Sequence, residues 1–232
     1  MKGMLLVDKP ASWTSFDVVN YVRKMVAQAE GKPPRQVKVG HTGTLDPFAT
    51  GLLVLLIGKE YTRKAGELSK LDKTYEVTMR LGQTSSTGDP EGEITPISDK
   101  WPVETAITET LKKFTGTIEQ TPPAYSAIKI NGQRAYKLAR AGKEVKLEPR
   151  QVTINRLELV EYNYPDVKLI ADVSSGTYVR SLVEDIGEAL GTGAYTIELR
   201  RTDVGNLQIS RAELIKYVKT ENIQEPDLKS MA

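Results

Sequence analysis

The sequence Gly-His-Thr-Gly-Thr-Leu-Asp-Pro-Phe-Ala-Thr-Gly occupies residues 40–51, and the apolar run Leu-Leu-Val-Leu-Leu-Ile follows it at 52–57. A short, continuous apolar run is typical of a strand buried on both faces. Gly43 and Gly51 permit backbone angles that other residues avoid, and Pro47 favours an extended conformation at Asp46. The pattern predicts a constrained loop that presents the Asp46 carboxylate just before a buried strand. It also fits a turn in which Asp46 accepts hydrogen bonds from nearby amides, so the loop alone leaves both interpretations open.

Strand-like and helix-like segments alternate on both sides of this loop without a strict βαβ rhythm. The strand patterns cover 3–7, 73–81, 152–160, 167–173 and 195–199, and the helix patterns cover 15–29, 103–114, 133–141, 177–190 and a final helix from 210. Ser15 and Thr177 are the expected N-caps of two of these helices. The order favours an α+β fold in which helices pack on a mixed, largely antiparallel sheet.

The composition excludes several kinds of site. The 232 residues include no cysteine and a single histidine, His41, which rules out disulfides, thiolate metal sites and multi-histidine metal sites. We therefore expect neither a metal nor a cofactor. The first apolar run is too short for a signal peptide and the longest, at 52–57, is far shorter than a membrane span, so we expect a cytoplasmic protein with no membrane association.

Positive charge is concentrated in two segments, although the net charge is only +2. Residues 23–38 hold five basic side chains against Glu30 alone, and residues 129–150 hold seven against Glu144 and Glu148. Such clusters are typical of a face that binds a polyanion, and equally of ordinary solvated surface.

Three further residues could contribute to a site. Arg180 stands near the start of a helix, where a cation is disfavoured unless an anion such as Asp46 pairs with it; otherwise it is a surface arginine. Tyr75 offers a ring on which a base could stack, but a strand tyrosine is more often part of the core. Leu199 is expected in the core by default.

Five blocks in order resemble the tRNA pseudouridine synthase B family, over roughly residues 3–205. The blocks are Leu6–Pro10 with Trp13–Val19, Gly40–Gly51, Lys73–Tyr75, Pro122–Lys129, and Gly176–Leu182 with Leu199–Arg201. The resemblance implies the pseudouridine-synthase sheet with a thumb-like insertion at about 124–150. It also implies an isomerase that acts alone, as a monomer without guide RNA or a protein partner, on the T arm of tRNA.

Residue roles follow from the same resemblance. Asp46 matches the catalytic nucleophile, which acts on the T-loop uridine at tRNA position 55 after base flipping. His41 matches the residue that helps to flip the nucleotide, and Tyr75 the stacking tyrosine that assists catalysis. Arg180 matches the catalytic partner of the aspartate, while Tyr178 and Leu199 match walls of the uracil pocket.

The chain departs from the family pattern at three places. Ser12 stands where a glycine is usual, and Val173 where a cysteine is common. Family members often carry a further C-terminal RNA-binding domain, whereas only 27 residues follow Gly205 here. We therefore expect a catalytic domain at 1–205 and, at 206–232, a short helix and polar tail that form no separate domain.

Two other functions fit parts of the pattern. A glycoside or nucleoside hydrolase usually needs two cooperating carboxylates, and the matching blocks supply Asp46 alone. A non-catalytic tRNA-binding or tRNA-folding module would use the basic segments equally well, but binding does not require a carboxylate that faces RNA phosphates.

Overall fold

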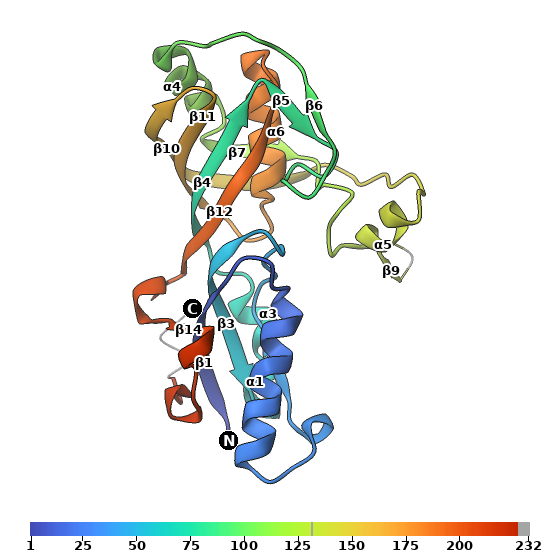
Figure 1. Cartoon of the computed structure of the whole chain (residues 1–232), viewed down its shortest axis with the longest axis vertical. Helices are drawn as coiled ribbons and strands as arrows, with labels where there is room; N and C mark the ends of the chain where they lie inside the picture. Colours follow the sequence, from blue (N-terminus) through green and yellow to red (C-terminus); the bar gives the residue numbers. More distant parts are fainter. Residues whose placement is uncertain (131, 227–232) are drawn as a thin grey trace. The chain divides into compact units, whose positions relative to one another are not determined.

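The computed structural model describes residues 1–130 and 132–226. The chain forms two compact units, one of Met1–Glu76 together with the segment from Leu199 onward, and one of Val77–Glu198. Strands β4 (Lys73–Leu81) and β12 (Ala194–Val204) each run from one unit into the other (Figure 1). Strands β1 and β14 pair in parallel, as do β3 and β12, whereas β1 with β3, β2 with β3, β7 with β10, β10 with β11, and β12 with β13 are antiparallel. The predicted mixed, largely antiparallel sheet is confirmed.

The first unit is built around strand β3. Its elements are β1 (Gly3–Lys9), α1 (Ser15–Ala29), η1 (Pro34–Gln36), β2 (Val39–His41), β3 (Thr50–Ile57), α2 (Lys59–Thr62), α3 (Ala65–Leu68), β13 (Leu207–Gln208), η2 (Ile209–Arg211), β14 (Glu213–Leu214), η3 (Ile215–Tyr217) and η4 (Thr220–Asn222). Strand β3 pairs with β1, β2 and the end of β12, and is buried from Gly51 to Ile57. The continuous apolar run is thus the buried strand that the sequence predicts.

Helix α1 has the predicted bounds, but its N-cap is Thr14 rather than Ser15. The Thr14 hydroxyl accepts a hydrogen bond from the Asp17 amide, and the Asp17 carboxylate accepts one from the Thr14 amide, which together form a capping box. Ser15 is already helical and its side chain is buried. Because the Ser15 hydroxyl bonds elsewhere, as described below, it is not available to cap the helix.

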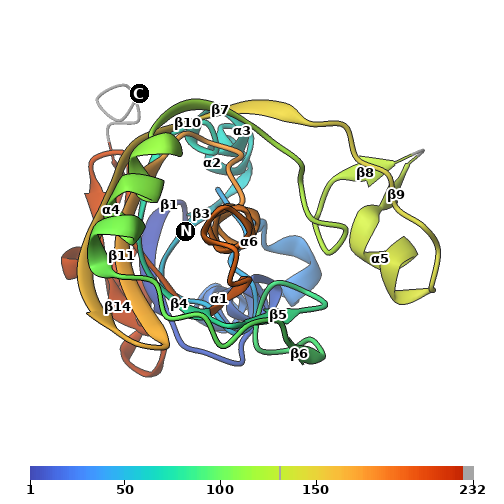
Figure 2. The same cartoon turned by 90° about the horizontal axis from the view of Figure 1, so that it is seen from above.

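The second unit carries helices α4 and α6 beside antiparallel strands. Its elements are β5 (Gln83–Ser85), β6 (Ile94–Pro96), α4 (Glu104–Lys113), β7 (Gly116–Gln120), β8 (Lys129–Ile130), β9 (Gln133–Arg134), α5 (Ala135–Arg140), β10 (Arg150–Asn163), β11 (Asp166–Val173) and α6 (Val179–Leu190). Strand β10 pairs with β7 on one side and β11 on the other. In Figure 2, the short elements α5, β8 and β9 stand apart from the strands of this unit, as a thumb-like insertion would.

Two predicted helix boundaries and one predicted helix are wrong. The expected helix at 133–141 begins only at Ala135, because Gln133 and Arg134 form the short strand β9. Helix α6 has Tyr178 rather than Thr177 at its N-cap. From Ser210 onward, the described residues form three-residue 3₁₀ turns and strand β14 instead of a helix. There the chain pairs with the edge of β1, where Met4 and Gln224 exchange backbone hydrogen bonds, and this pairing outweighs the local helix preference. No helix among the described residues has the length and apolarity needed to cross a membrane.

Candidate active site

The Asp46 loop is tied to helix α1 by Ser15. The Ser15 hydroxyl accepts a hydrogen bond from the Leu45 amide at 2.8 Å and donates one to the Leu45 carbonyl at 3.0 Å. Both residues are buried, with 3% of their surface exposed. Because Leu45 directly precedes Asp46, these two hydrogen bonds fix the backbone next to the residue that carries the carboxylate.

Pro47, the residue after Asp46, is also held in place. The Lys9 ammonium, fully buried, donates to the carbonyls of Trp13 at 2.7 Å and Pro47 at 3.3 Å. The Ser12 amide also donates to the Pro47 carbonyl, at 2.8 Å, and to do so Ser12 takes a φ of +67°. A non-glycine residue in this region is strained, which explains why a glycine suits the position better.

Arg201 anchors both ends of the loop. Its guanidinium, 1% exposed, donates to the Leu52 carbonyl at 2.7 Å and to the Gly43 carbonyl at 3.1 Å. Gly51 has a φ of +101°, and a Cβ there would lie 2.3 Å from the Arg201 carbonyl oxygen, so only glycine fits. Gly43, whose lack of a side chain would also permit such an angle, does not adopt a positive φ.

His41 lies at the start of the same loop, and its imidazole ring is neutral. It ends strand β2 opposite Leu55 of β3. Burial lowers the pKa of the His41 imidazole, and the Arg201 guanidinium lowers it further, so the ring is uncharged near pH 7. Among the described residues, no group hydrogen-bonds to its buried Nδ1 atom.

The strand candidates of the first unit lie in its core. Tyr75 and Leu199 are each 7% exposed, Tyr75 on β4 and Leu199 on β12. Lys73, two residues before Tyr75 on the same face of β4, donates to the Ser69 carbonyl at 2.9 Å. Burial, and to a lesser extent Arg201, lower the pKa of the Lys73 ammonium to about 8.

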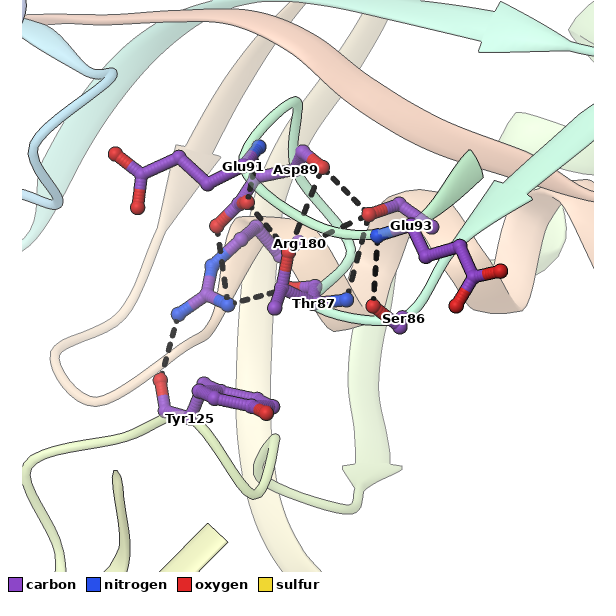
Figure 3. Close-up of polar contacts among 8 residues, drawn as sticks. Ser86, Thr87, Asp89, Glu91, Glu93, Tyr125 and Arg180 are labelled. Carbon is purple, nitrogen blue, oxygen red and sulfur yellow. Dashed lines mark hydrogen bonds and ion pairs between the residues drawn. The ribbon is translucent and has the colours of Figure 1, made fainter. Parts of the chain in front are cut away.

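In the second unit, Arg180 is a buried cation at the start of α6. Its guanidinium, 4% exposed, donates to the carbonyls of Thr87 at 2.6 Å and Tyr125 at 2.8 Å (Figure 3). The Asp89 carboxylate lies 3.5 Å from it, and also accepts hydrogen bonds from the Thr87 hydroxyl and the Glu91 amide. The alternative of a water-exposed arginine is therefore wrong, since Arg180 is fixed by a turn that Asp89 organises.

Tyr178 precedes Arg180 and is clamped through its backbone. The side chain of buried Gln120 accepts from the Tyr178 amide at 2.8 Å and donates to the Tyr178 carbonyl at 3.1 Å. This clamp takes the place of the expected Thr177 cap. The Arg150 guanidinium lies over the Tyr178 ring, 5.0 Å from its centre, and leaves the ring half-buried.

The predicted site residues thus fall into two groups. His41, Asp46, Tyr75 and Leu199 belong to the first unit, and Tyr178 and Arg180 to the second. The pairing of Asp46 with Arg180 stays a prediction. Sequence reasoning missed the supporting residues Ser15, Lys9, Arg201 and Asp89. Two of them are lysine and arginine side chains that are buried, against the usual preference of these residues, and only the structure reveals this.

Comparison with known proteins places these features in a family. A sequence profile described as "TruB family pseudouridylate synthase (N terminal domain)" matches residues 28–179, and one described as "tRNA pseudouridylate synthase B C-terminal domain" matches residues 180–229. Proteins named tRNA pseudouridine synthase B are similar to this chain. The one from Pseudomonas putida is 48% identical over 94% of this chain and 69% of its own length, and the one from Burkholderia mallei is 44% identical over 99% and 73%.

Solved structures give the same result. The chain is similar to a protein in the crystal structure of a Cbf5-Nop10-Gar1 complex, with a TM-score of 0.70 and 29% identity, over 93% of this chain and 54% of that one. It is also similar to a protein in an H/ACA RNP bound to a substrate RNA, with a TM-score of 0.66 and 27% identity over 92% of this chain and 51% of that one. The chain spans about half the length of these solved relatives. Because the family profile matches residues 28–179 and the relatives are 44% to 48% identical over 94% to 99% of this chain, the chain belongs to the TruB family of pseudouridylate synthases.

Proposed function

We propose that the chain isomerises the uridine at position 55 in the T loop of tRNA to pseudouridine, with Asp46 as the catalytic nucleophile after base flipping. The observation that carries this proposal is the way the Asp46 loop is held. Ser15, Lys9 and Arg201 fix the residues before and after the carboxylate through buried hydrogen bonds. A binding surface does not need the backbone around a carboxylate to be held so firmly, whereas a catalytic group does, because misplacement by about 1 Å can cost roughly a hundredfold in rate.

The reaction breaks the N1–C1′ bond, forms a C5–C1′ bond, and moves the C5 proton ultimately to solvent while N1 gains one. The atomic composition of the nucleoside is unchanged. The protein must therefore supply a nucleophile, hold the base out of its stack, and exclude water from the site. The uncharged His41 ring suits contact with an unstacked base better than an imidazolium would, because a neutral ring loses less hydration on burial. Tyr75, Tyr178 and Leu199 are proposed to line the base, and Arg180 to assist Asp46.

The test is to incubate the purified protein alone with unmodified tRNA and to map pseudouridine. Conversion at position 55, without any added RNA or protein, is the expected result. Release of free uracil would instead indicate a hydrolase, and tight binding without conversion would indicate a tRNA-binding module. We further propose that the protein works as a monomer in the cytoplasm, with residues 1–205 as the catalytic domain; light scattering of the active sample checks the monomer.

A further inference from the structure

A basic cavity lies in the first unit, between α1, η1 and β2. Its volume is about 410 Å³. Four cationic side chains line it, Arg23 and Lys24 from α1, and Arg35 and Lys38 from the segment that leads into β2. Buried Val37 and Val39 contribute to its lining, as does the Gly40 backbone. The cavity therefore combines an apolar wall with converging positive charge.

Over residues 1–130 and 132–226, none of these four cations forms an ion pair. Glu30 is the only acidic residue between positions 18 and 45, and it pairs with the Met1 amino group and with Lys32, which is outside the cavity. Among the described residues, no carboxylate lies within ion-pair distance of Lys24, Arg35 or Lys38. Four like charges converge on one cavity only at an electrostatic cost, which a bound anion would relieve.

Part of the cavity is organised before any ligand binds. The Arg23 guanidinium donates to the Asn20 side chain at 2.5 Å and to the Val39 carbonyl at 3.4 Å, both neutral acceptors. It also lies over the exposed ring of Phe16, 5.8 Å from its centre. These contacts orient Arg23 while leaving its charge unmatched, so an anion that binds here meets a donor whose position is already set.

We infer that this cavity binds a backbone phosphate of the substrate RNA, close to the target uridine. The inference rests on the proposed function, because the location follows from His41. Gly40 lines the cavity and His41 is the next residue, so the two α-carbons are about 3.8 Å apart. Arg23 bonds to the carbonyl of Val39, two residues before His41, so an RNA strand whose target base meets His41 passes beside the cavity. Phosphate contacts of this kind fix the register of RNA without reading its sequence.

The experiment measures RNA affinity as a function of salt. The probe is a T-arm hairpin that already carries pseudouridine at the target position, so no turnover disturbs the equilibrium. The variant Arg35→Gln with Lys38→Gln removes two exposed cavity charges. The matched control Lys2→Gln with Lys32→Gln removes two exposed charges of the same unit that pair with Glu60 and Glu30 outside the cavity. Thermal unfolding confirms that both variants are folded.

Each neutralised phosphate contributes about 0.7 to 0.9 to the slope of log K against log salt. Because the cavity is inferred to hold one phosphate, the cavity variant is expected to lose about 0.7 to 0.9 from this slope, and its affinity deficit should shrink as salt rises. The control is expected to keep the wild-type slope. An unchanged slope in the cavity variant, or an equal loss in both variants, would overturn the inference. Conversion of tRNA by the wild type is scored separately, so a failure of the cavity is distinguishable from a failure of the proposed function.

Discussion

Replacement of Ser15 by alanine should separate rigidity of the Asp46 loop from RNA binding. The change removes both hydrogen bonds between the Ser15 hydroxyl and Leu45. The buried amide and carbonyl of Leu45 then lack the hydroxyl as a partner. A buried polar group that loses its hydrogen-bond partner costs about 1 to 3 kcal/mol. Because the smaller side chain lets the loop relax, the two groups together should lower the free energy of unfolding by roughly 2 to 4 kcal/mol, less than the full sum. Relaxation displaces Asp46, and displacement by about 1 Å predicts a fall of roughly a hundredfold in kcat.

The assay is single-turnover release of tritium from tRNA labelled at uracil C5, since that hydrogen leaves in the reaction. The affinity of the Ser15→Ala protein for the T-arm hairpin should stay within about twofold of wild type, because the Ser15 side chain is buried and out of reach of bound RNA. Thr14→Ala is the matched control: it removes the N-cap of the same helix, at about 1 kcal/mol, without touching Leu45.

The comparison refutes the reasoning in either of two ways. If Ser15→Ala reacts at the wild-type rate while its unfolding midpoint falls, then the bonds to Leu45 stabilise the fold but do not position the carboxylate. If Thr14→Ala loses as much rate as Ser15→Ala, then loss of helix stability, rather than a displaced loop, explains the effect.

Three further predictions concern stability. Ser12→Gly should raise the free energy of unfolding by about 1 kcal/mol, because it relieves the positive φ, and a lower urea midpoint would contradict this. Asp89→Asn should lower it by about 3 kcal/mol and reduce turnover, because the Arg180 guanidinium loses a buried carboxylate, as urea unfolding and tritium release would reveal. Burial raises the pKa of the Glu184 carboxyl to about 7, so the folded protein keeps this proton from about pH 4.5 to 7, where the unfolded chain has lost it. The stability of wild type relative to Glu184→Gln should therefore fall over that interval, and a flat difference would refute the shift.

The fold was predictable where local pattern and tertiary packing agree. Strand β4 has the bounds expected from its alternation, with Tyr75, Val77 and Met79 buried on one face. Helix α1 also has its expected bounds, because its apolar stripe matches the period of a helix. The C-terminal helix was wrong because a neighbouring strand edge supplied a competing set of backbone hydrogen bonds, which no local pattern reveals.

The site was predictable for residues that carry the family motifs, and not for those that support them. Ser15 resembles an N-cap in sequence, and nothing local shows that its hydroxyl reaches 30 positions along the chain to Leu45. Arg201 and Asp89 are ordinary charged residues until the fold buries them beside carbonyls or an opposite charge. Such roles depend on contacts between distant segments, which a single sequence does not encode in any readable pattern.

The most direct measurement is the reaction of Asp46→Asn, a nearly isosteric change that removes only the charge, under single-turnover conditions. The carboxylate as nucleophile predicts no detectable pseudouridine at position 55 in the Asp46→Asn reaction, together with an affinity for the T-arm hairpin close to that of wild type. Conversion within tenfold of the wild-type rate would contradict the assignment of Asp46 and, with it, the catalytic role of the loop that Ser15, Lys9 and Arg201 hold in place.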